Sequence, residues 1–312
     1  MFEKVMSLNA LQRIRLYLQN HRAFNSKKSW YDFLNKIIDK ITDNDVNERS
    51  NSVAYNLLLA VFPGIIFLFT LIPYIPYPGL ENEIMEFLRR FLPATTYDTV
   101  KTTILDIISQ PRSGILSLGF VLALYAATSG MVALMTAFNT SHRTGEGRTF
   151  IKTRLIAVAL TVMLVVSLFL AVSVLVVGGV ISEYLKDFRI FDNAVFYLLI
   201  DIGRYLLILA VFMMAVAVIY RFGPDVDMKW AFITPGSITA SLLIVLTTYG
   251  FSYYVSNFGS YNKLYGSIGT LIVLMIWINL VSLLLILGFE MNVTLYDLEG
   301  EKDPQPAQKI AS

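Results

Sequence analysis

The stretch from residue 155 to residue 182 reads LIAVALTVMLVVSLFLAVSVLVVGGVIS and contains no Asp, Glu, Lys or Arg. About 20 apolar residues in a helix cross the hydrocarbon of a bilayer, so this stretch is long enough to span one. Five similar stretches cover 50–80, 113–142, 193–220, 230–262 and 264–289; only the third contains charged residues, Asp201 and Arg204. None resembles the short apolar core of a cleaved signal. The pattern predicts an all-α integral membrane protein with six transmembrane helices, at about 53–75, 114–139, 155–182, 194–220, 231–257 and 266–293.

The composition agrees with a membrane protein. Of 312 residues, 55% are hydrophobic and 15% are charged, which lies outside the range of soluble globular domains. The loops are too short for a second globular domain. We therefore expect an N-terminal segment at 1–50, one membrane domain at 51–295 and a disordered tail at 296–312.

The basic residues predict the orientation. Seventeen Lys and Arg residues lie before the first span, in the loops 140–154 and 221–230, and in the tail, against seven in the alternate loops. An excess of Lys and Arg marks the cytoplasmic side, so both termini are predicted to be cytoplasmic. Topology explains these charges, and nucleic acid is not an expected partner.

Metal and enzyme motifs are missing from the sequence. There is no Cys, and the two histidines, His21 and His142, lie outside the spans and far apart. Ordinary zinc sites and disulfides are therefore not expected. The glycines of 145–149 lack the spacing and the Lys of a phosphate loop, and no loop holds a carboxylate cluster for metal-dependent hydrolysis. We expect neither an enzyme nor a bound cofactor.

Two segments outside the spans have helical periodicity. Before span 1, apolar residues recur on one face, at Trp30, Phe33, Leu34, Ile37, Ile38 and Ile41. Such an amphipathic helix can lie in the headgroup region, either as an anchor or as a lipid-sensing gate. Between spans 1 and 2, the segment 77–113 predicts an external helical hairpin of 83–92 and 97–108, turned at Pro93.

Helix-breaking and small residues predict bends and close packing. The candidate breaks are Pro63, Pro235, Gly236, Gly266 and Gly269, each either a packing device or a hinge. In span 2, Gly and Ala recur every four residues, which lets helix backbones approach closely in lipid. Such faces would serve a homo-oligomer as well as an intrachain core.

One polar set is predicted near the outer face. Asp201 and Arg204 are three residues apart and share one face of span 4. They are either a polar station for an anionic substrate or a self-neutralising pair that fixes the rotation of the helix. The loop after span 5 is rich in Asn, Tyr and Gly, as either a shaped vestibule or an interfacial belt. The candidate pathway residues are Asp201, Arg204, Asn257, Tyr261, Asn262, Tyr265 and Asn279.

A second polar set is predicted at the cytoplasmic ends of the spans. Its members are Tyr55, Asn56, Asn139, Glu290 and Asn292. Glu290 either reaches the headgroups by snorkelling or belongs to a proton- or ion-coupled inner gate.

The stretch 235–293 carries a family resemblance. It contains Pro235-Gly236, a run of Tyr, Asn and Gly residues from Phe251 to Gly269, and then Trp277, Gly288, Glu290 and Asn292. These residues resemble the signature of the BrkB/YihY family of bacterial inner-membrane proteins. The resemblance implies a multi-pass protein of the bacterial inner membrane with a role in the cell envelope. An old ribonuclease label in that family is regarded as a misassignment, and the missing nuclease ligands agree.

The leading hypothesis is a transporter or flippase for an amphipathic or anionic envelope compound, with a phospholipid as the main example. A secondary transporter of a small polar solute and a non-transporting scaffold for envelope assembly stay open. The first requires contact with membrane lipids, and the last requires a partner that co-purifies. A membrane-bound nuclease is disfavoured.

Overall fold

The structure is a computed structural model and describes residues 10–23, 29–42, 45–75, 79–91, 94–108, 113–141, 147–187, 194–226, 230–257 and 260–300. Within these ranges the chain is almost entirely helical and forms no strand longer than the bridge between Arg22 and Ser29. In chain order the elements are α2 (Ala10–Asn20), α3 (Trp30–Thr42), α4 (Asp45–Leu71), η1 (Ile72–Tyr74), α5 (Leu80–Phe91), α6 (Ala94–Ile108), α7 (Ser113–Ser141), α8 (Phe150–Asp187), α9 (Ala194–Phe222), α10 (Pro235–Asn257) and α11 (Ser260–Gly300).

Six of these helices are long and apolar enough to cross a membrane, which confirms the predicted number of spans. Among the described residues they cover Asp45–Tyr74, Leu116–Ser141, Phe150–Val180, Leu198–Phe222, Pro235–Val255 and Leu271–Tyr296. The first helix begins at Asp45, earlier than predicted, since Asp45 and Glu48 favour a helix N-terminus. The last helix continues to Gly300, so the first residues of the tail expected to be disordered are helical; 301–312 lie outside the described residues.

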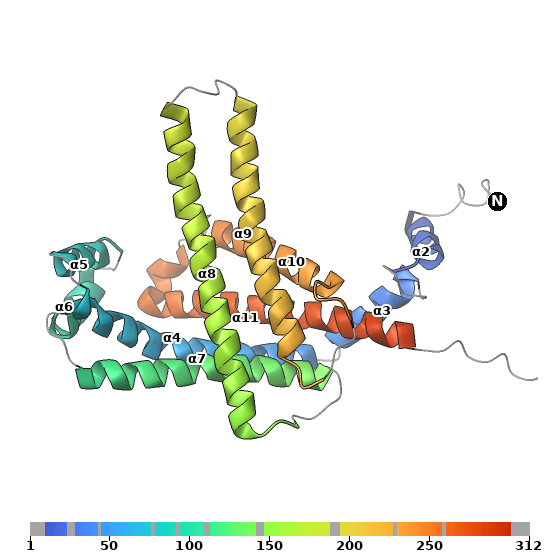
Figure 1. Ribbon diagram of the computed structural model, residues 1–312, viewed down its shortest axis with the longest axis horizontal. Coiled ribbons are helices and arrows are strands. Elements are labelled where there is room, and N and C mark those ends of the chain that lie inside the picture. The colour runs from blue at the N-terminus through green and yellow to red at the C-terminus, as the bar shows by residue number, and fades with distance from the viewer. Residues whose placement is uncertain are drawn as a thin grey trace, which may run out of the picture.

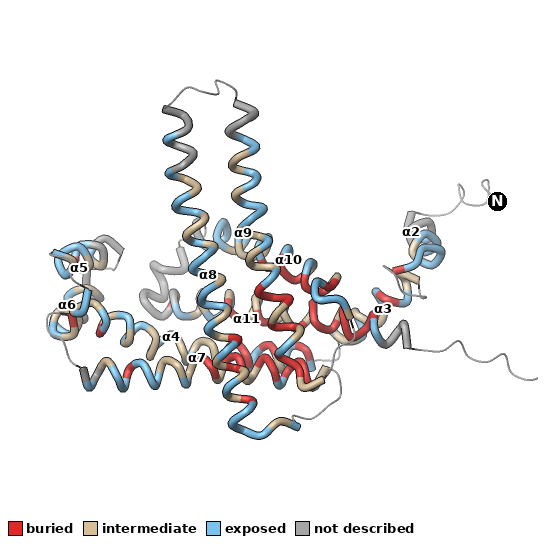
Figure 2. The backbone as a smooth tube through the Cα atoms, in the orientation of Figure 1, coloured by how far each residue is buried: buried red, intermediate tan, exposed pale blue. Residues whose placement is uncertain are grey.

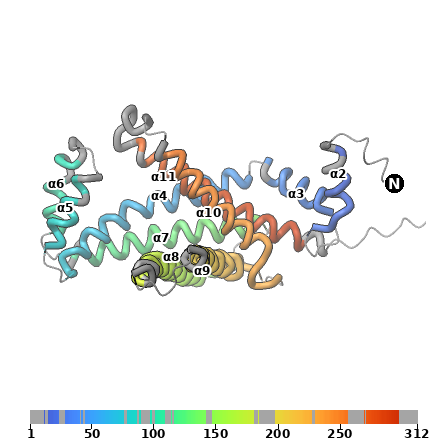
Figure 3. Tube along the Cα trace, turned by 90° about the horizontal axis from the view of Figure 1, so that it is seen from above, coloured from blue at the N-terminus to red at the C-terminus, as the bar shows by residue number. Residues whose placement is uncertain are grey.

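The spans form a layer and a crossing hairpin. The layer consists of α4, α7, α10 and α11. Within it, α4 packs against α7 and α11, and α10 packs against α11. Figures 1 and 3 show the α8–α9 hairpin crossing this layer steeply and extending well beyond it. Membrane helices tilt by up to about 40° from the bilayer normal. Because the hairpin and the layer cross steeply, both can span one bilayer only if they tilt in opposite directions.

The buried core lies where the hairpin meets the layer (Figure 2). Its largest side chains are aromatic: Phe138 of α7 stacks on Phe289 of α11 with ring centroids 4.3 Å apart, and Tyr220 of α9 meets both edge-on. By contrast, no residue is buried in 161–180 of α8 or 198–214 of α9. The hairpin is therefore attached to the layer through one half of its length.

Small residues bring α4 and α7 together, as predicted for span 2. A Cβ added at Gly130 would overlap the side chain of Leu57, and one at Gly119 would lie 3.7 Å from the Cα of Phe67. In lipid, where no hydrophobic force draws helices together, such close approach supplies the van der Waals contact that holds them.

The two predicted amphipathic segments are helical. The hairpin between the first two spans consists of α5 and α6, which contact each other; Pro93 lies outside the described residues. The helix before span 1 is α3, and its face is partly used within the protein. Phe33 is buried in a small cluster with Ala23 and Leu295, so α3 docks on the end of α11, while Leu34 and Ile38 stay exposed.

The predicted breaks do not interrupt the helices. Pro63 lies inside α4, and Gly266 and Gly269 lie inside α11. Pro235 is the first residue of α10, where its missing N–H costs nothing, and Gly236 follows it as a packing position. Span 5 ends at Asn257 as predicted, but residues 260–265 of the loop expected at 258–265 are helical, because α11 begins at Ser260. In lipid every backbone group needs a partner, so isolated glycines do not end a helix.

The arrangement makes the predicted orientation testable. Figure 1 shows α2 and α3 at one end of α4 and α7, and α5 and α6 at the other. The chain has no native Cys, so a single introduced cysteine is the only thiol of the protein that a maleimide can label. We expect Lys101→Cys on α6 to react with an impermeant maleimide in intact spheroplasts, and Arg15→Cys on α2 to react only after permeabilisation. The opposite labelling pattern would reverse the orientation, and equal labelling of both would place them on one side.

Candidate functional site

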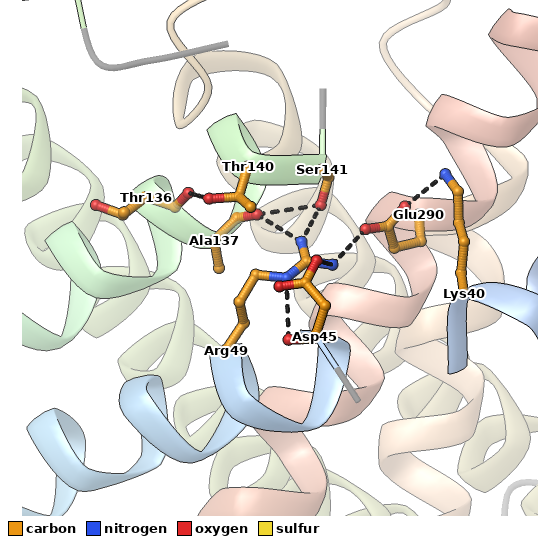
Figure 4. Close-up of polar contacts among 8 residues, drawn as sticks. All are labelled: Lys40, Asp45, Arg49, Thr136, Ala137, Thr140, Ser141 and Glu290. Atoms are coloured by element: carbon orange, nitrogen blue, oxygen red, sulfur yellow. Dashed lines mark hydrogen bonds and ion pairs between the residues drawn. The ribbon is translucent and has the colours of Figure 1, made fainter. Parts of the chain in front are cut away.

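A buried cluster of charges joins α3, α4, α7 and α11 (Figure 4). Glu290 of α11 has a side chain only 2% exposed, and its two oxygens contact different cations. Lys40 Nζ of α3 lies 2.7 Å from Oε2, and Arg49 Nη2 of α4 lies 2.7 Å from Oε1. Together with Asp45, which lies 3.1 Å from Arg49 Nη2, these residues form what we call the Glu290 cluster. Its formal charges balance, with two cations and two carboxylates.

Arg49 also holds the end of α7. Its Nη1 donates to the carbonyl oxygen of Ala137 at 2.8 Å and to Ser141 Oγ at 2.5 Å. A cation is favourable at a helix C-terminus, where carbonyl groups have no helical partner. One guanidinium therefore ties the last turn of α7 to α4 and α11, and Lys40 adds α3.

Burying the Glu290 carboxylate has a high desolvation cost, but each of its oxygens is paired with a cation. Arg49 is 11% exposed and Lys40 is 31% exposed, so Glu290 and Arg49 are largely removed from water while Lys40 lies at the rim. Two charge-assisted hydrogen bonds to Glu290 offset the cost of burying its carboxylate. These contacts hold α3, α4 and α11 in one arrangement.

A second polar group lies at the start of α10. Thr234 and Ser237 cap the helix reciprocally, with Ser237 N donating to Thr234 Oγ1 at 3.1 Å and Thr234 N to Ser237 Oγ at 3.0 Å. Asn292 of α11 completes the group: its Oδ1 accepts from Gly236 N at 2.9 Å, and its Nδ2 donates to Thr234 Oγ1 at 2.8 Å. Asn292 thus fixes α10 against α11 through a fully buried network.

The remaining members of the predicted inner set have separate contacts. Asn139 Oδ1 accepts from the backbone N–H of Asp225 at 2.8 Å, which ties α7 to the segment after α9. Asn56 donates to the Ser52 carbonyl of its own helix, and Tyr55 is exposed. The structure places Glu290, Asn292 and Asn139 in three neighbouring but distinct networks rather than in one.

The predicted outer pair lies in the far part of the hairpin. Asp201 Oδ1 is 3.3 Å from Arg204 Nη2, and the Arg204 side chain packs on Gly178 of α8, where an added Cβ would lie 2.7 Å from Cδ. Their contacts among the described residues are with α8 and α9 alone. The structure therefore does not bring this pair to the Glu290 cluster.

Asn279 lies elsewhere again. Its Nδ2 donates to Asn51 Oδ1 at 2.6 Å, which joins α11 to α4. The other predicted pathway residues are in α10 or α11, but their side chains lie outside the described set; they are Asn257, Tyr261, Asn262 and Tyr265.

The sequence analysis missed the two cations of the Glu290 cluster. Lys40 and Arg49 were counted only as basic residues that set topology. A signal was present: a carboxylate near the end of a span needs a cationic partner, and Arg49 directly precedes the first charge-free stretch on the same predicted side. The described residues contain no group of three or more His, Asp or Glu side chains placed to hold a metal ion.

Comparisons with known proteins agree with the resemblance in the sequence. Residues 37–311 match the family described as Virulence factor BrkB. The chain is 30% identical over 274 residues to the ribonuclease-like protein YfkH of Bacillus subtilis, covering 88% of this chain and 98% of that protein. It is 24% identical to a UPF0761 membrane protein of Tolumonas auensis (90% and 88% covered) and 24% identical to one of Alteromonas mediterranea (89% and 93%). No solved structure matches the chain significantly.

Proposed function

The chain belongs to the BrkB family of membrane proteins, and from this premise we propose that it is a transporter or flippase for an amphipathic or anionic envelope compound. A phospholipid is the first substrate to test. The proposed place of action is the bacterial inner membrane. The proposal assigns the chain no catalytic residue and no cofactor.

The observation that carries the proposal is the buried Glu290 cluster. Glu290 satisfies two cations that would otherwise attract a phosphate or a carboxylate from outside the protein. An anionic substrate group can therefore compete with Glu290 for Arg49 and Lys40. In this mechanism the cluster is a latch: it holds α3, α4, α7 and α11 together when empty, and an anion replaces Glu290 when the helices separate.

Burial makes such an exchange effective. Charge interactions are stronger in a low-dielectric interior than in water, so the cations hold whichever anion reaches them. When the anion leaves, Glu290 returns and restores the closed arrangement. Glu290 thus has two tasks, closing the helices and displacing the bound anion, and both depend on its negative charge.

Two other functions use the same residues differently. A transporter of a small polar solute would keep the latch but would not accept a lipid. An envelope-assembly scaffold would use the cluster as a permanent lock, and it predicts a partner protein that co-purifies. A second copy of the chain is compatible with each of the three.

Reconstitution in liposomes with labelled phospholipid tests the proposal. We expect labelled lipid to move between leaflets faster than in protein-free vesicles. Glu290→Gln is expected to slow this movement about tenfold, the factor that corresponds to a loss of ~1.4 kcal/mol, because nothing then displaces the anion from Arg49 and Lys40. Lys101→Gln, an exposed lysine of α6, is the matched control and should behave as the unsubstituted protein.

The outcomes separate the functions. Lipid movement no faster than in empty vesicles contradicts the flippase, and uptake of a polar solute in the same vesicles would then favour the solute transporter. If neither moves and a protein co-purifies, the scaffold is favoured. Circular dichroism of Glu290→Gln is needed beside the rates, because an unfolded variant would also be slow.

A further inference from the structure

A cavity separate from the Glu290 cluster lies where α8 begins and α9 ends. Its volume is ≈ 370 Å³, and it is lined by Arg148, Lys152, Ile156, Arg221, Phe222, Pro224, Asp225 and Val226. We propose that this cavity binds the phosphate group of an anionic phospholipid. The inference does not rest on the proposed function, because a lipid held here need not cross the membrane.

Several groups that line the cavity are held by hydrogen bonds and one ion pair. Arg148 Nε lies 2.9 Å from Asp225 Oδ1, its Nη1 donates to the Gly223 carbonyl at 3.0 Å, and its Nη2 donates to the Pro224 carbonyl. Asp225 Oδ2 also accepts from Gly147 N at 2.8 Å. This network fixes the segment after α9 to the segment before α8. The cavity is therefore a shaped feature rather than a gap between loose loops.

Among the described residues that line the cavity, positively charged side chains outnumber negatively charged ones. Three cationic side chains line it against one carboxylate, and that carboxylate pairs with Arg148. Lys152 is exposed, and Arg221 is half-buried and donates to the Trp230 carbonyl at 3.5 Å. Basic pockets between membrane helices on the cytoplasmic side suit anionic headgroups. Each Lys or Arg near an anionic headgroup contributes to the attraction over about one Debye length.

The surroundings of the cavity favour a lipid over a free anion. Ile151 and Leu155 on α8 and Phe222 on α9 are exposed apolar side chains next to the charged residues. The cavity is also at the ends of two of the helices long and apolar enough to cross a membrane, Phe150–Val180 and Leu198–Phe222. A phosphate in the cavity would place acyl chains along these apolar faces. Inorganic phosphate would use the charges but not the apolar rim.

Native mass spectrometry of the purified, delipidated full chain tests the inference. The protein is titrated with phosphatidylglycerol, with zwitterionic phosphatidylcholine and with inorganic phosphate. We expect phosphatidylglycerol to bind most tightly and inorganic phosphate not to displace it at equal concentration. The double variant Lys152→Gln/Arg221→Gln is expected to weaken phosphatidylglycerol binding by at least about tenfold.

Matched variants separate a specific site from general attraction. Lys101→Gln removes one exposed charge far along the chain and should leave binding unchanged, while Arg221→Lys keeps the charge and should retain most of it. If the double variant misfolds, phosphatidylglycerol binding is measured with Lys152→Glu alone. Lys152 is exposed, so this substitution reverses a charge at the cavity without disturbing buried packing. Equal binding of phosphatidylglycerol by the double variant and the original chain would overturn the proposal. Preference for inorganic phosphate would overturn the assignment to a lipid.

Discussion

Arg49→Ala is expected to lower the free energy of unfolding by about 3–5 kcal/mol, the usual cost of removing one partner from a buried ion pair. The substitution leaves Glu290, which is 2% exposed, with Lys40 as its one cation among the described residues. It also removes the donor to Ala137 and Ser141 at the end of α7. Denaturation in detergent, followed by circular dichroism, measures the change.

Asp45→Ala is the matched control for this prediction. Asp45 contacts the same guanidinium at 3.1 Å but is 54% exposed, and exposed pairs contribute about 0–1 kcal/mol. Equal losses for Arg49→Ala and Asp45→Ala would mean that burial of Glu290 does not make the cluster important. The double variant Arg49→Ala/Glu290→Leu should recover part of the loss, since no buried carboxylate is then left with one cation.

The double variant also connects stability with function. It removes the Glu290 carboxylate and one of its cations, and it is expected to be more stable than Arg49→Ala alone. If the cluster is a latch for transport, the double variant should be folded and inactive. If the cluster is a fixed lock in a scaffold, the double variant should keep its partner and its cellular role.

The membrane spans could be predicted because their signal is local. A stretch such as 155–182 has no charge over a length that no soluble helix requires, and each of the six stretches became a helix. The α5–α6 hairpin was likewise visible in its periodicity. The sequence could not show which face of each helix packs against the other helices. In lipid both faces of a span are apolar, so the pattern does not show which face meets α7 and which meets the acyl chains.

The site was harder to predict because it depends on contacts between distant segments. Glu290 was recognised as a candidate, but its partners Lys40 and Arg49 are some 250 and 241 residues away in the chain. Asn292 was recognised as well, and its role became clear only from the start of α10, where Gly236 and Thr234 contact it. Residues 258–265 were predicted as a loop from their Asn and Gly content, which indicates turns in water better than in lipid.

The contact between α10 and α11 predicts the second large effect. Gly236→Ala is expected to lower the free energy of unfolding by about 3 kcal/mol, because the new Cβ would overlap the backbone carbonyl of Gly288 and the Asn292 side chain. Backbone cannot rotate away as a side chain can, so the two helices must separate. Separation would break the 2.9 Å bond from Gly236 N to Asn292. The same denaturation experiment measures the loss.

Gly288→Ala tests this contact from the other helix, and Gly250→Ala shows what the substitution does without it. At Gly288 the new Cβ would lie 2.5 Å from Tyr220 Oη and 2.6 Å from Ala240 Cβ, so a loss similar to that of Gly236→Ala is expected. At Gly250, also in α10, no heavy atom lies within 4 Å, and Ala should stabilise the helix by up to about 1 kcal/mol through its higher propensity. If Gly236→Ala and Gly250→Ala behaved alike, the close contact of α10 with α11 would be absent from the protein in its membrane. Opposite signs for the two would establish that these helices meet through their glycines, next to the same stretch of α11 that carries Glu290.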